Sequence, residues 1–326
     1  MQPKLRKIYD FLYEYEQTYV FKQKKEQKRK GGRPKTYTDT SFLLFFMAMF
    51  LKGIFAFKKM ARIIKKDYAQ YGFIKPPSRK TIRERFKKLP KIIQYMLPQI
   101  ACYCYRKVCF DTFTLKCLFS DKSIFRAKGG LWHKKHMKNG LIPHNSIDID
   151  ATWAKSAYHG WRFGFALLIM VNKNRFPVAA IADTATLNEP KSVKQLIQPI
   201  HQWVGIIVGD IAYKVYKIIQ NIKNEFGILL QVRAKIKNKA MKWYDDLIST
   251  PQALWLYLKR KPSVEPTFAL IKELFNLKGE TQLPYKGLKY VIPFLLVTVL
   301  TIQIMAVYNF FNNKGLGYTI DFVDIF

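Results

Sequence analysis

Acidic residues are scarce in this chain of 326 residues. Only 22 aspartates and glutamates oppose 56 lysines and arginines, which gives a formal net charge of +34. A surplus of this size repels itself unless a polyanion lies near, so it favours nucleic-acid binding. The alternative explanation of the basic composition is biased codon usage in an AT-rich genome. That bias explains the preference for lysine over arginine but not the large net charge. The excess is uneven, since the first 110 residues hold 27 basic and 7 acidic side chains.

Cysteine is also rare, and its spacing argues against the common zinc motifs. No two of the four cysteines form the CxxC pair typical of structural zinc; they are Cys102, Cys104, Cys109 and Cys117. The opening residues, MQPKLRKIYDFLYEYEQ, contain no apolar run of the kind found in a secretory signal. The sequence therefore predicts reduced thiols in a cytoplasmic, nucleoid-associated protein.

Long hydrophobic runs are few, but one is long enough to cross a bilayer. Residues 291–311 are 21 residues without an acidic or basic side chain. Pro293, Gln303 and Asn309 interrupt this run, and a membrane span would leave the charge of +34 unexplained. The prediction is a buried C-terminal helix, and a membrane protein is the alternative.

The first 110 residues indicate a basic helical region that binds DNA. Hydrophobic spacing predicts helices over 4–18, 38–54 and 55–70, and the basic segment 22–35 is interpreted as a flexible arm. After a break, Ser78 opens another helix that is expected to end before Pro90. Residues 55–89 then have the pattern of a helix-turn-helix. The side chains expected to face DNA are Arg79, Lys80 and Arg83, and those expected to face the core are Ile82, Phe86 and Leu89.

From residue 111 onward, strand-like and helix-like segments alternate. Apolar runs predict strands at 114–120, 163–172, 177–182, 204–209 and 228–233, with helices at 191–203 and 213–226. Three strands in a row, followed by helix, strand, helix and strand, are the order of a ribonuclease-H-like fold. We therefore predict an α/β fold with a mixed five-stranded sheet and flanking helices at 111–313. An all-α domain at 1–110 precedes it, and a tail at 314–326 follows.

Two aspartates at the ends of predicted strands are expected to lie together. Asp121 ends the first strand and Asp210 the fourth, and these strands are neighbours in a ribonuclease-H-like sheet. Adjacent carboxylates repel each other unless a cation lies between them, and Mg²⁺, or Mn²⁺ in its place, is the ion that prefers oxygen ligands. Two such ions activate a water and stabilise the leaving oxygen of a phosphodiester. Asp148 and Asp150 are the alternatives to Asp121, and Asp183 is the alternative to Asp210.

Glu265 is the candidate for a third carboxylate. It precedes Pro266, which predicts a position at or near the N-terminus of a helix. Lys272 lies two helical turns later on the same face, within reach of a phosphate beside the metals. The predicted catalytic and metal-binding residues are thus Asp121, Asp210 and Glu265, with Lys272 as a DNA contact.

These motifs resemble those of the DDE transposases of bacterial insertion sequences. The resemblance runs from about residue 32 to 313, and Lys272 keeps the family's spacing after the glutamate. The matching segments are RPKTYTD at 33–39, DKS at 121–123, GDIAY at 209–213 and VEPTF at 264–268. One departure lies upstream of the glutamate, where some members carry a tyrosine and an arginine. The expected arginine position is Lys261, with Arg260 beside it, and Tyr257 is one residue out of register.

The resemblance implies magnesium-dependent transposition. Water would first cut a strand at the element's end, and the freed 3′-hydroxyl would then attack target DNA. The implied partners are double-stranded DNA, as terminal inverted repeats and target, and a second copy of the chain in a homodimer on paired ends. The implied cofactor is a pair of Mg²⁺ ions in each active site. A non-enzymatic or decayed relative that only binds DNA is the alternative function.

The segment 132–160 is predicted to face DNA. It holds four of the five histidines, which permits zinc as an alternative. However, tryptophans and basic residues are interleaved there, as on surfaces that stack on bases and follow the phosphate backbone. The residues expected to contact DNA are Trp132, His133, Lys134 and Lys155.

Overall fold

Helices make up the N-terminal region of the computed structural model, which describes residues 1–26, 36–108, 116–141, 146–156, 160–279, 281–314 and 320–325. These helices are α1 (Pro3–Glu26), α2 (Asp39–Leu51), α3 (Phe57–Asp67), the short 3-10 helix η1 (Tyr68–Tyr71) and α4 (Arg79–Val108). α1 includes the start of the expected arm at 22–35, whose residues 27–35 lie outside the described residues.

The predicted helix end before Pro90 is wrong, because α4 continues through both Pro90 and Pro98. A proline removes one backbone donor from a helix interior. Its cost is offset here by burial, since the apolar side chains of Leu89, Ile93 and Leu97 repeat at helical spacing and are almost completely buried. Ile82 and Phe86 are buried as predicted.

A mixed six-stranded sheet forms the centre of the remaining chain. Its strands are β1 (Cys117–Arg126), β2 (Thr152–Ser156), β3 (Gly160–Val171), β4 (Pro177–Thr184), β5 (Ile206–Val208) and β6 (Leu229–Gln231). β3 pairs antiparallel with β1 and β4, whereas β5 pairs parallel with β1 and β6. The five predicted strands are present, and the α/β fold with a mixed sheet is confirmed. β2 is a short addition within the segment 132–160 that pairs with the start of β3.

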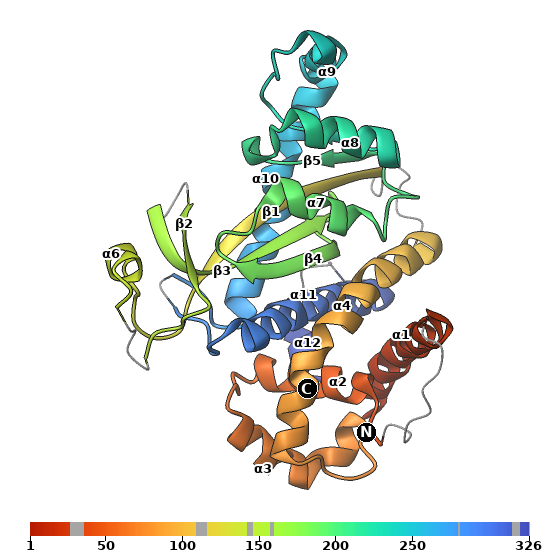
Figure 1. Ribbon diagram of the computed structural model, residues 1–326. Helices are drawn as coiled ribbons and strands as arrows, with labels where there is room; N and C mark the ends of the chain where they lie inside the picture. The colour runs from red at the N-terminus through yellow and green to blue at the C-terminus, as the bar shows by residue number, and fades with distance from the viewer. Residues whose placement is uncertain are drawn as a thin grey trace.

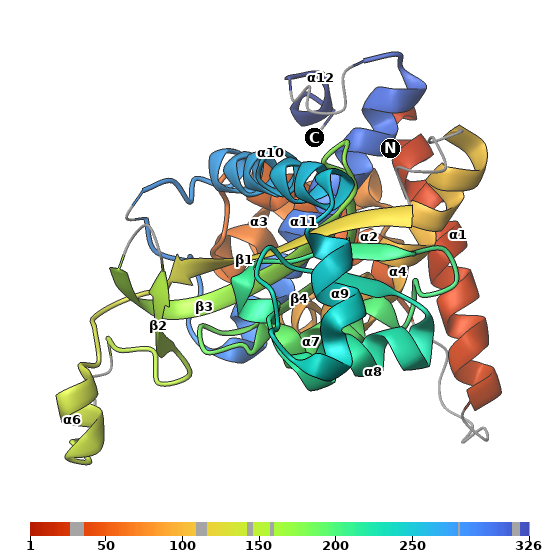
Figure 2. The same cartoon turned by 90° about the horizontal axis from the view of Figure 1, so that it is seen from above.

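Helices lie on both sides of this sheet. They include α7 (Glu189–Ile197), η2 (Ile211–Tyr213), α8 (Tyr216–Phe226), η3 (Lys239–Met241), α9 (Lys242–Ile248) and α10 (Pro251–Leu274). Figure 2 shows α10 on one side of the strands and α7 and α8 on the other. The neighbouring strands β1 and β5 are therefore approached by α10 from one face and by α7 from the opposite face.

The long apolar helix α11 (Leu288–Phe311) joins the N-terminal helices to the sheet (Figure 1). It packs against α2, α4 and β4. The Gln303 side-chain amide donates hydrogen bonds to the carbonyls of Leu97 in α4 at 2.7 Å and Pro177 in β4 at 2.8 Å. Among the described helices, α11 is the one long and apolar enough to cross a membrane, and 94% of its most apolar window is buried. The predicted buried C-terminal helix is confirmed.

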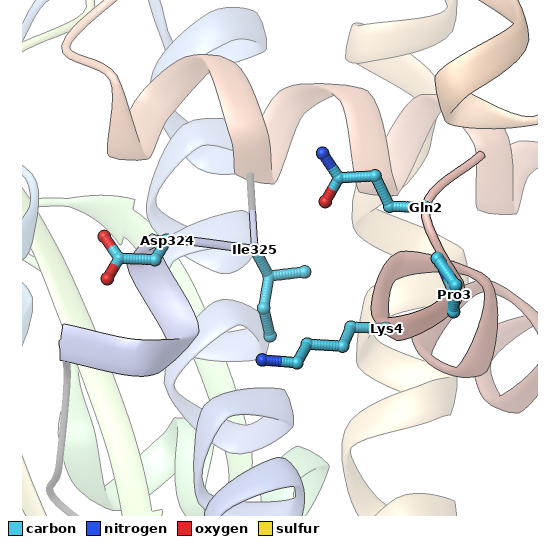
Figure 3. Close-up of a pocket in the computed structure, with 5 residues that line it drawn as sticks. All are labelled: Gln2, Pro3, Lys4, Asp324 and Ile325. Atoms are coloured by element: carbon cyan, nitrogen blue, oxygen red, sulfur yellow. The ribbon is translucent and has the colours of Figure 1, made fainter.

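The two ends of the described chain meet beside α1. A cavity of about 510 Å³ is lined by Gln2, Pro3, Lys4, Asp324 and Ile325, the last two from the segment of the short helix α12 (Ile320–Val323) (Figure 3). These residues lie on the N-terminal helices and the C-terminal end, so this cavity is separate from the strand edge that carries the candidate site.

Candidate active site

Asp121 and Asp210 lie opposite each other at the junction of β1 and β5. The pairing of these strands ends at Phe119 and Val208, and each aspartate follows two residues later. Asp121 does not end its strand as predicted, because β1 continues to Arg126 in its pairing with β3. The Asp210 carboxylate accepts a hydrogen bond from the Ile211 amide at 2.6 Å and thereby caps η2. The two carboxylates therefore meet where β5 stops and β1 continues.

Arg260 of α10 supplies the positive charge shared by this pair. Its guanidinium Nη1 donates to Asp121 Oδ2 at 2.7 Å, and Nη2 lies 3.8 Å from Asp210 Oδ1. The Arg260 side chain is 6% exposed, compared with 22% for Asp121 and 42% for Asp210. Burial raises the pKa of the Asp121 carboxyl above its usual value, while the Arg260 charge opposes that rise. The guanidinium thus offsets part of the negative charge of the pair in this structure.

Sequence reasoning did not assign Arg260 a role. It is the neighbour of Lys261, the position at which the family resemblance predicts an arginine. The spacing of Tyr257 and Arg260 in the sequence was the available signal. In the structure the two side chains are also close together, with the Arg260 guanidinium 5.8 Å from the centroid of the Tyr257 ring. The tyrosine and arginine keep their mutual spacing and are shifted together relative to Glu265.

Tyr213 anchors the loop that carries Asp210. Its ring is completely buried, and its hydroxyl shares a hydrogen bond of 2.9 Å with the hydroxyl of Ser120 in β1. A Cβ atom added to Gly209 would lie 2.5 Å from this ring, so glycine is required beside it. The GDIAY motif therefore fixes Asp210 against β1 through its glycine and tyrosine, and Ser120 is a further residue that sequence reasoning missed.

Glu265 lies in the interior of α10, so the predicted position at a helix N-terminus is wrong. The helix begins at Pro251 and contains both Pro262 and Pro266. The loop between β3 and β4 supports α10 near these prolines, because the Thr267 hydroxyl donates to the Arg175 carbonyl at 3.3 Å. The same hydroxyl also lies 3.3 Å from the Ser263 carbonyl within the helix. These contacts and the buried face of the helix keep the chain helical through the prolines.

The Glu265 side chain is exposed and does not lie with the two aspartates. Five residues separate it from Arg260, which places the two side chains roughly 140° apart around the helix. Arg260 lies on the buried face of α10, so Glu265 lies on a different face. Within the described part of the chain, no three or more acidic, histidine or cysteine side chains are grouped closely enough to hold a metal ion. Lys272 is partly buried against the Phe125 ring, and burial, followed by the charge of Arg162, lowers its pKa.

The alternative acids have other positions. The Asp148 carboxylate accepts a hydrogen bond from the Gly287 amide, and the Asp150 carboxylate accepts one from the Leu288 amide, each at 2.8 Å. Both therefore hold the N-terminus of α11. Asp183 lies on β4, which pairs with β3 rather than with β1 or β5.

Apart from Lys272 on α10, the predicted DNA contacts fall into two groups. Arg79 and Lys80 are exposed at the start of α4, whereas the Arg83 side chain is hydrogen-bonded to the Tyr290 hydroxyl. The other group lies just before and on the short helix α6 (Lys134–Lys138) and on β2, which Figure 1 shows at the far edge of the sheet from the N-terminal helices.

In that second group, the Trp153 indole donates to the Trp132 carbonyl at 2.7 Å, and the His133 ring stacks on Trp153. Lys155 is exposed on β2, and the Lys134 side chain lies outside the described residues. Of the histidines in this segment, His144 and His159 also fall outside the described residues.

The chemistry of the aspartate pair fits a divalent cation. Both side chains offer hard oxygen donors, and both already face one positive group. An ion between them would take the place of the guanidinium. Asp121 and Asp210 are therefore the residues of this site that could hold a metal.

A comparison with known protein families found a match that spans the strand edge. Residues 118–279, just under half of the chain, match the sequence model of the family described as transposase DDE domain. The predicted DDE transposase domain is confirmed over this segment. The match includes Asp121, Asp210, Arg260 and Glu265. A comparison with curated protein sequences found no match.

Solved structures of transposases are also similar to this chain. A cryo-EM structure of the piggyBac transposase synaptic complex with hairpin DNA has a TM-score of 0.42 at 9% identity, covering 98% of this chain and 76% of that chain. A Mos1 transposase paired-end complex with left transposon end has a TM-score of 0.22 at 10% identity, covering 89% and 82%. A Mos1 mariner paired end complex with Mn has a TM-score of 0.24 at 14% identity, covering 88% and 83%. TM-scores this low do not establish a shared fold, so the assignment depends on the family match.

Proposed function

We propose that this protein is a transposase that uses divalent metal, preferably Mg²⁺, to cut DNA at an element's ends and to transfer the cut strand into target DNA. The observation that carries the proposal is the meeting of Asp121 and Asp210 at one sheet edge, within a transposase DDE domain, around a single positive group. Magnesium, when bound, would supply Lewis-acid activation of water and stabilisation of the leaving oxygen.

The residues around the pair have separable roles in this proposal. Asp121 and Asp210 hold the cation, and Tyr213 keeps Asp210 in place through Ser120. Arg260 offsets part of the negative charge of the pair in the metal-free chain, and a bound cation would free its guanidinium for a DNA phosphate, for which guanidinium is a good match. Glu265 is the third acid of the predicted triad, and its side chain lies on another face of α10 from Arg260 in this structure.

DNA is the proposed substrate, and a homodimer on paired ends is the proposed assembly. The net charge of +34 supports a polyanionic partner. The basic start of α4 and the segment with α6 and β2 offer two separate contacts for one duplex or for two. The proposed sites are Arg79, Lys80, Arg83, Trp132, His133, Lys134, Lys155 and Lys272. A cytoplasmic, nucleoid-associated location follows from this role.

Cleavage of the DNA that flanks the gene tests the function. The purified chain should nick this DNA only when Mg²⁺ or Mn²⁺ is added. Asp121→Asn and Asp210→Asn should each lower the rate by roughly a hundredfold or more, since changes to residues that only orient a metal's ligands already cost about 10- to 100-fold. Glu265→Gln is expected to lose activity as well, and Asp246→Asn, an exposed aspartate of α9, should retain it.

Two outcomes would contradict the proposal. Cleavage that survives Asp121→Asn and Asp210→Asn would show that the chemistry lies elsewhere. Tight DNA binding without any metal-dependent nicking by the unaltered chain would instead favour the alternative, a DNA-binding relative without catalysis.

A further inference from the structure

A basic loop follows β6 and has no part in the site as proposed so far. Its basic side chains are all exposed and alternate with uncharged ones; they belong to Arg233, Lys235, Lys237 and Lys239. The ion pairs of the described residues include none of these four. The loop therefore presents positive charges that the described carboxylates leave unpaired, which favours a ligand of opposite charge.

Two residues of α9 hold this loop in shape. The Asp245 carboxylate accepts hydrogen bonds from the backbone amides of Ile236 at 2.6 Å and Lys237 at 2.8 Å. The Tyr244 hydroxyl accepts one from the Val232 amide at 3.0 Å, directly after β6. Lys237 has a positive φ of 59°, which is uncommon for a residue other than glycine. The hydrogen bonds to Asp245 stabilise this conformation, so the fold itself fixes the course of the loop.

A cavity of about 240 Å³ lies between this loop and α10. Arg233 and Lys235 line it from the loop, and Tyr257 lines it from the helix. The Tyr257 ring has two guanidiniums close to it, since Arg233 lies 5.9 Å and Arg260 5.8 Å from the centroid of the ring. Arg260 in turn donates to Asp121 at 2.7 Å. The Tyr257 ring thus connects the cavity to the arginine that contacts the aspartate pair.

The cavity lies on the face of the sheet toward which Asp121 points. Gln231, which also lines the cavity, pairs in β6 with the residue of β5 that lies two positions before Asp210. Its side-chain amide donates to the Ala253 carbonyl of α10 at 2.5 Å. Asp121 reaches the same helix through Arg260. A DNA strand held at the two aspartates can therefore continue along this face to the basic loop.

The chemistry of the cavity fits a phosphodiester. Guanidinium and ammonium groups bind phosphate through charge-assisted hydrogen bonds, and the guanidinium fork matches two phosphate oxygens. The cavity is also smaller than the roughly 300–1,000 Å³ that a drug-sized ligand occupies. We propose that Arg233 and Lys235 bind a phosphate of the DNA strand that adjoins the phosphate held at Asp121 and Asp210. This inference rests on the proposed function and adds a substrate-binding subsite to it.

Replacement of single phosphates tests this contact in the full chain. Each probe is a labelled duplex from the DNA that flanks the gene, with one phosphate near the element's end replaced by an uncharged methylphosphonate. Fluorescence anisotropy in EDTA measures its affinity, so the result does not depend on the metal site. For the unaltered chain, replacement of the contacted phosphate should weaken binding by about tenfold, as expected when a charge-assisted hydrogen bond is lost.

The double variant Arg233→Ala with Lys235→Ala should remove this penalty, because the partner of the phosphate is already missing. Lys239→Ala is the matched control, since it removes a charge from the same loop but does not line the cavity, and it should keep the tenfold penalty. An equal penalty at the same phosphate in the double variant and the unaltered chain would overturn the inference. Weaker binding of every probe with an unchanged pattern would overturn it too, since only net charge would have been lost.

Nicking of the unmodified duplex with Mg²⁺ separates this inference from the function beneath it. If the unaltered chain nicks DNA and the double variant keeps the interference pattern, only the role of Arg233 and Lys235 is refuted. If the penalty depends on these two residues but the unaltered chain never nicks DNA, the phosphate contact stands and the proposed catalysis fails.

Discussion

At the scale of single residues, Arg260 and a divalent cation compete for the same two carboxylates. The guanidinium contacts Asp121 directly and lies near Asp210, so a metal between them must displace it. Removal of a single partner from such a buried pair leaves uncompensated charge. The arginine thus stabilises the metal-free chain at the expense of metal affinity.

Arg260→Ala should therefore bind Mn²⁺ more tightly and be less stable without it. We expect an affinity gain of about tenfold, equivalent to ~1.4 kcal/mol, and a loss of about 3 kcal/mol in the free energy of unfolding in EDTA. Mn²⁺ titration and urea unfolding measure these two effects. Lys259→Ala, an exposed neighbour on α10, is the control and should change neither. Weaker Mn²⁺ binding in Arg260→Ala would mean that the arginine helps to build the site.

The raised pKa of Asp121 gives the metal-free chain a specific pH dependence. Because the folded state holds this proton more tightly than the unfolded state, the stability contribution of Asp121 falls as pH rises from the usual aspartate pKa through the folded pKa. Asp121→Asn should remove this fall. Urea unfolding in EDTA across the acidic range compares the two chains, and identical slopes would contradict the assignment.

At the scale of elements, Asp148 and Asp150, the alternatives to Asp121 as metal ligands, hold the start of a helix instead. Asp148 is 2% exposed, and its carboxylate accepts hydrogen bonds from the amides of Gly287 and Asp150. An unpaired amide at the start of α11 would be costly, because helix N-termini carry donors without internal partners. Asp148 therefore contributes to stability through α11.

Asp148→Ala should lower the free energy of unfolding by about 1–2 kcal/mol and leave Mn²⁺ binding unchanged. Urea unfolding and Mn²⁺ titration on the same sample give both values. Asp246→Ala, on the surface of α9, serves as the stability control. A loss of Mn²⁺ affinity in Asp148→Ala would return this residue to the list of metal ligands.

The order of elements was accessible to sequence reasoning, whereas their boundaries at prolines and the contacts between distant elements were not. Apolar runs located every strand of the predicted sheet, because burial on both faces leaves a clear pattern. Pro90 and Pro266 predict helix boundaries, but tertiary burial of α4 and α10 outweighs the lost hydrogen bonds.

The candidate site was predicted only in part for a related reason. Asp121 and Asp210 follow strands, and strand order alone brings them together. Arg260 reaches the same edge from α10, and the rotation of that helix about its axis decides which side chain arrives. That rotation depends on packing, which a single sequence does not reveal.

At the scale of the whole molecule, the positive charge should make DNA binding strongly dependent on salt. Each phosphate neutralised contributes about −0.9 to the slope of log K against log salt concentration. If Arg79 and Lys80 both contact phosphates, the double change Arg79→Ala and Lys80→Ala should reduce the magnitude of that slope by about 1.8.

Fluorescence anisotropy with a labelled duplex, repeated over a range of salt concentrations, measures this slope. The matched control is the double change Lys4→Ala and Lys7→Ala on α1, which removes the same charge beside the end of α11. An equal reduction in both double variants would show that net charge, rather than the start of α4, determines the contact.

The most direct test of the metal site is a crystal structure of the full chain grown with Mn²⁺, with the ion located by anomalous scattering. The expected result is a peak that contacts the carboxylates of both Asp121 and Asp210, with the Arg260 guanidinium displaced from Asp121. A peak elsewhere in the molecule, with the guanidinium still bound between the two aspartates at saturating Mn²⁺, would contradict the account.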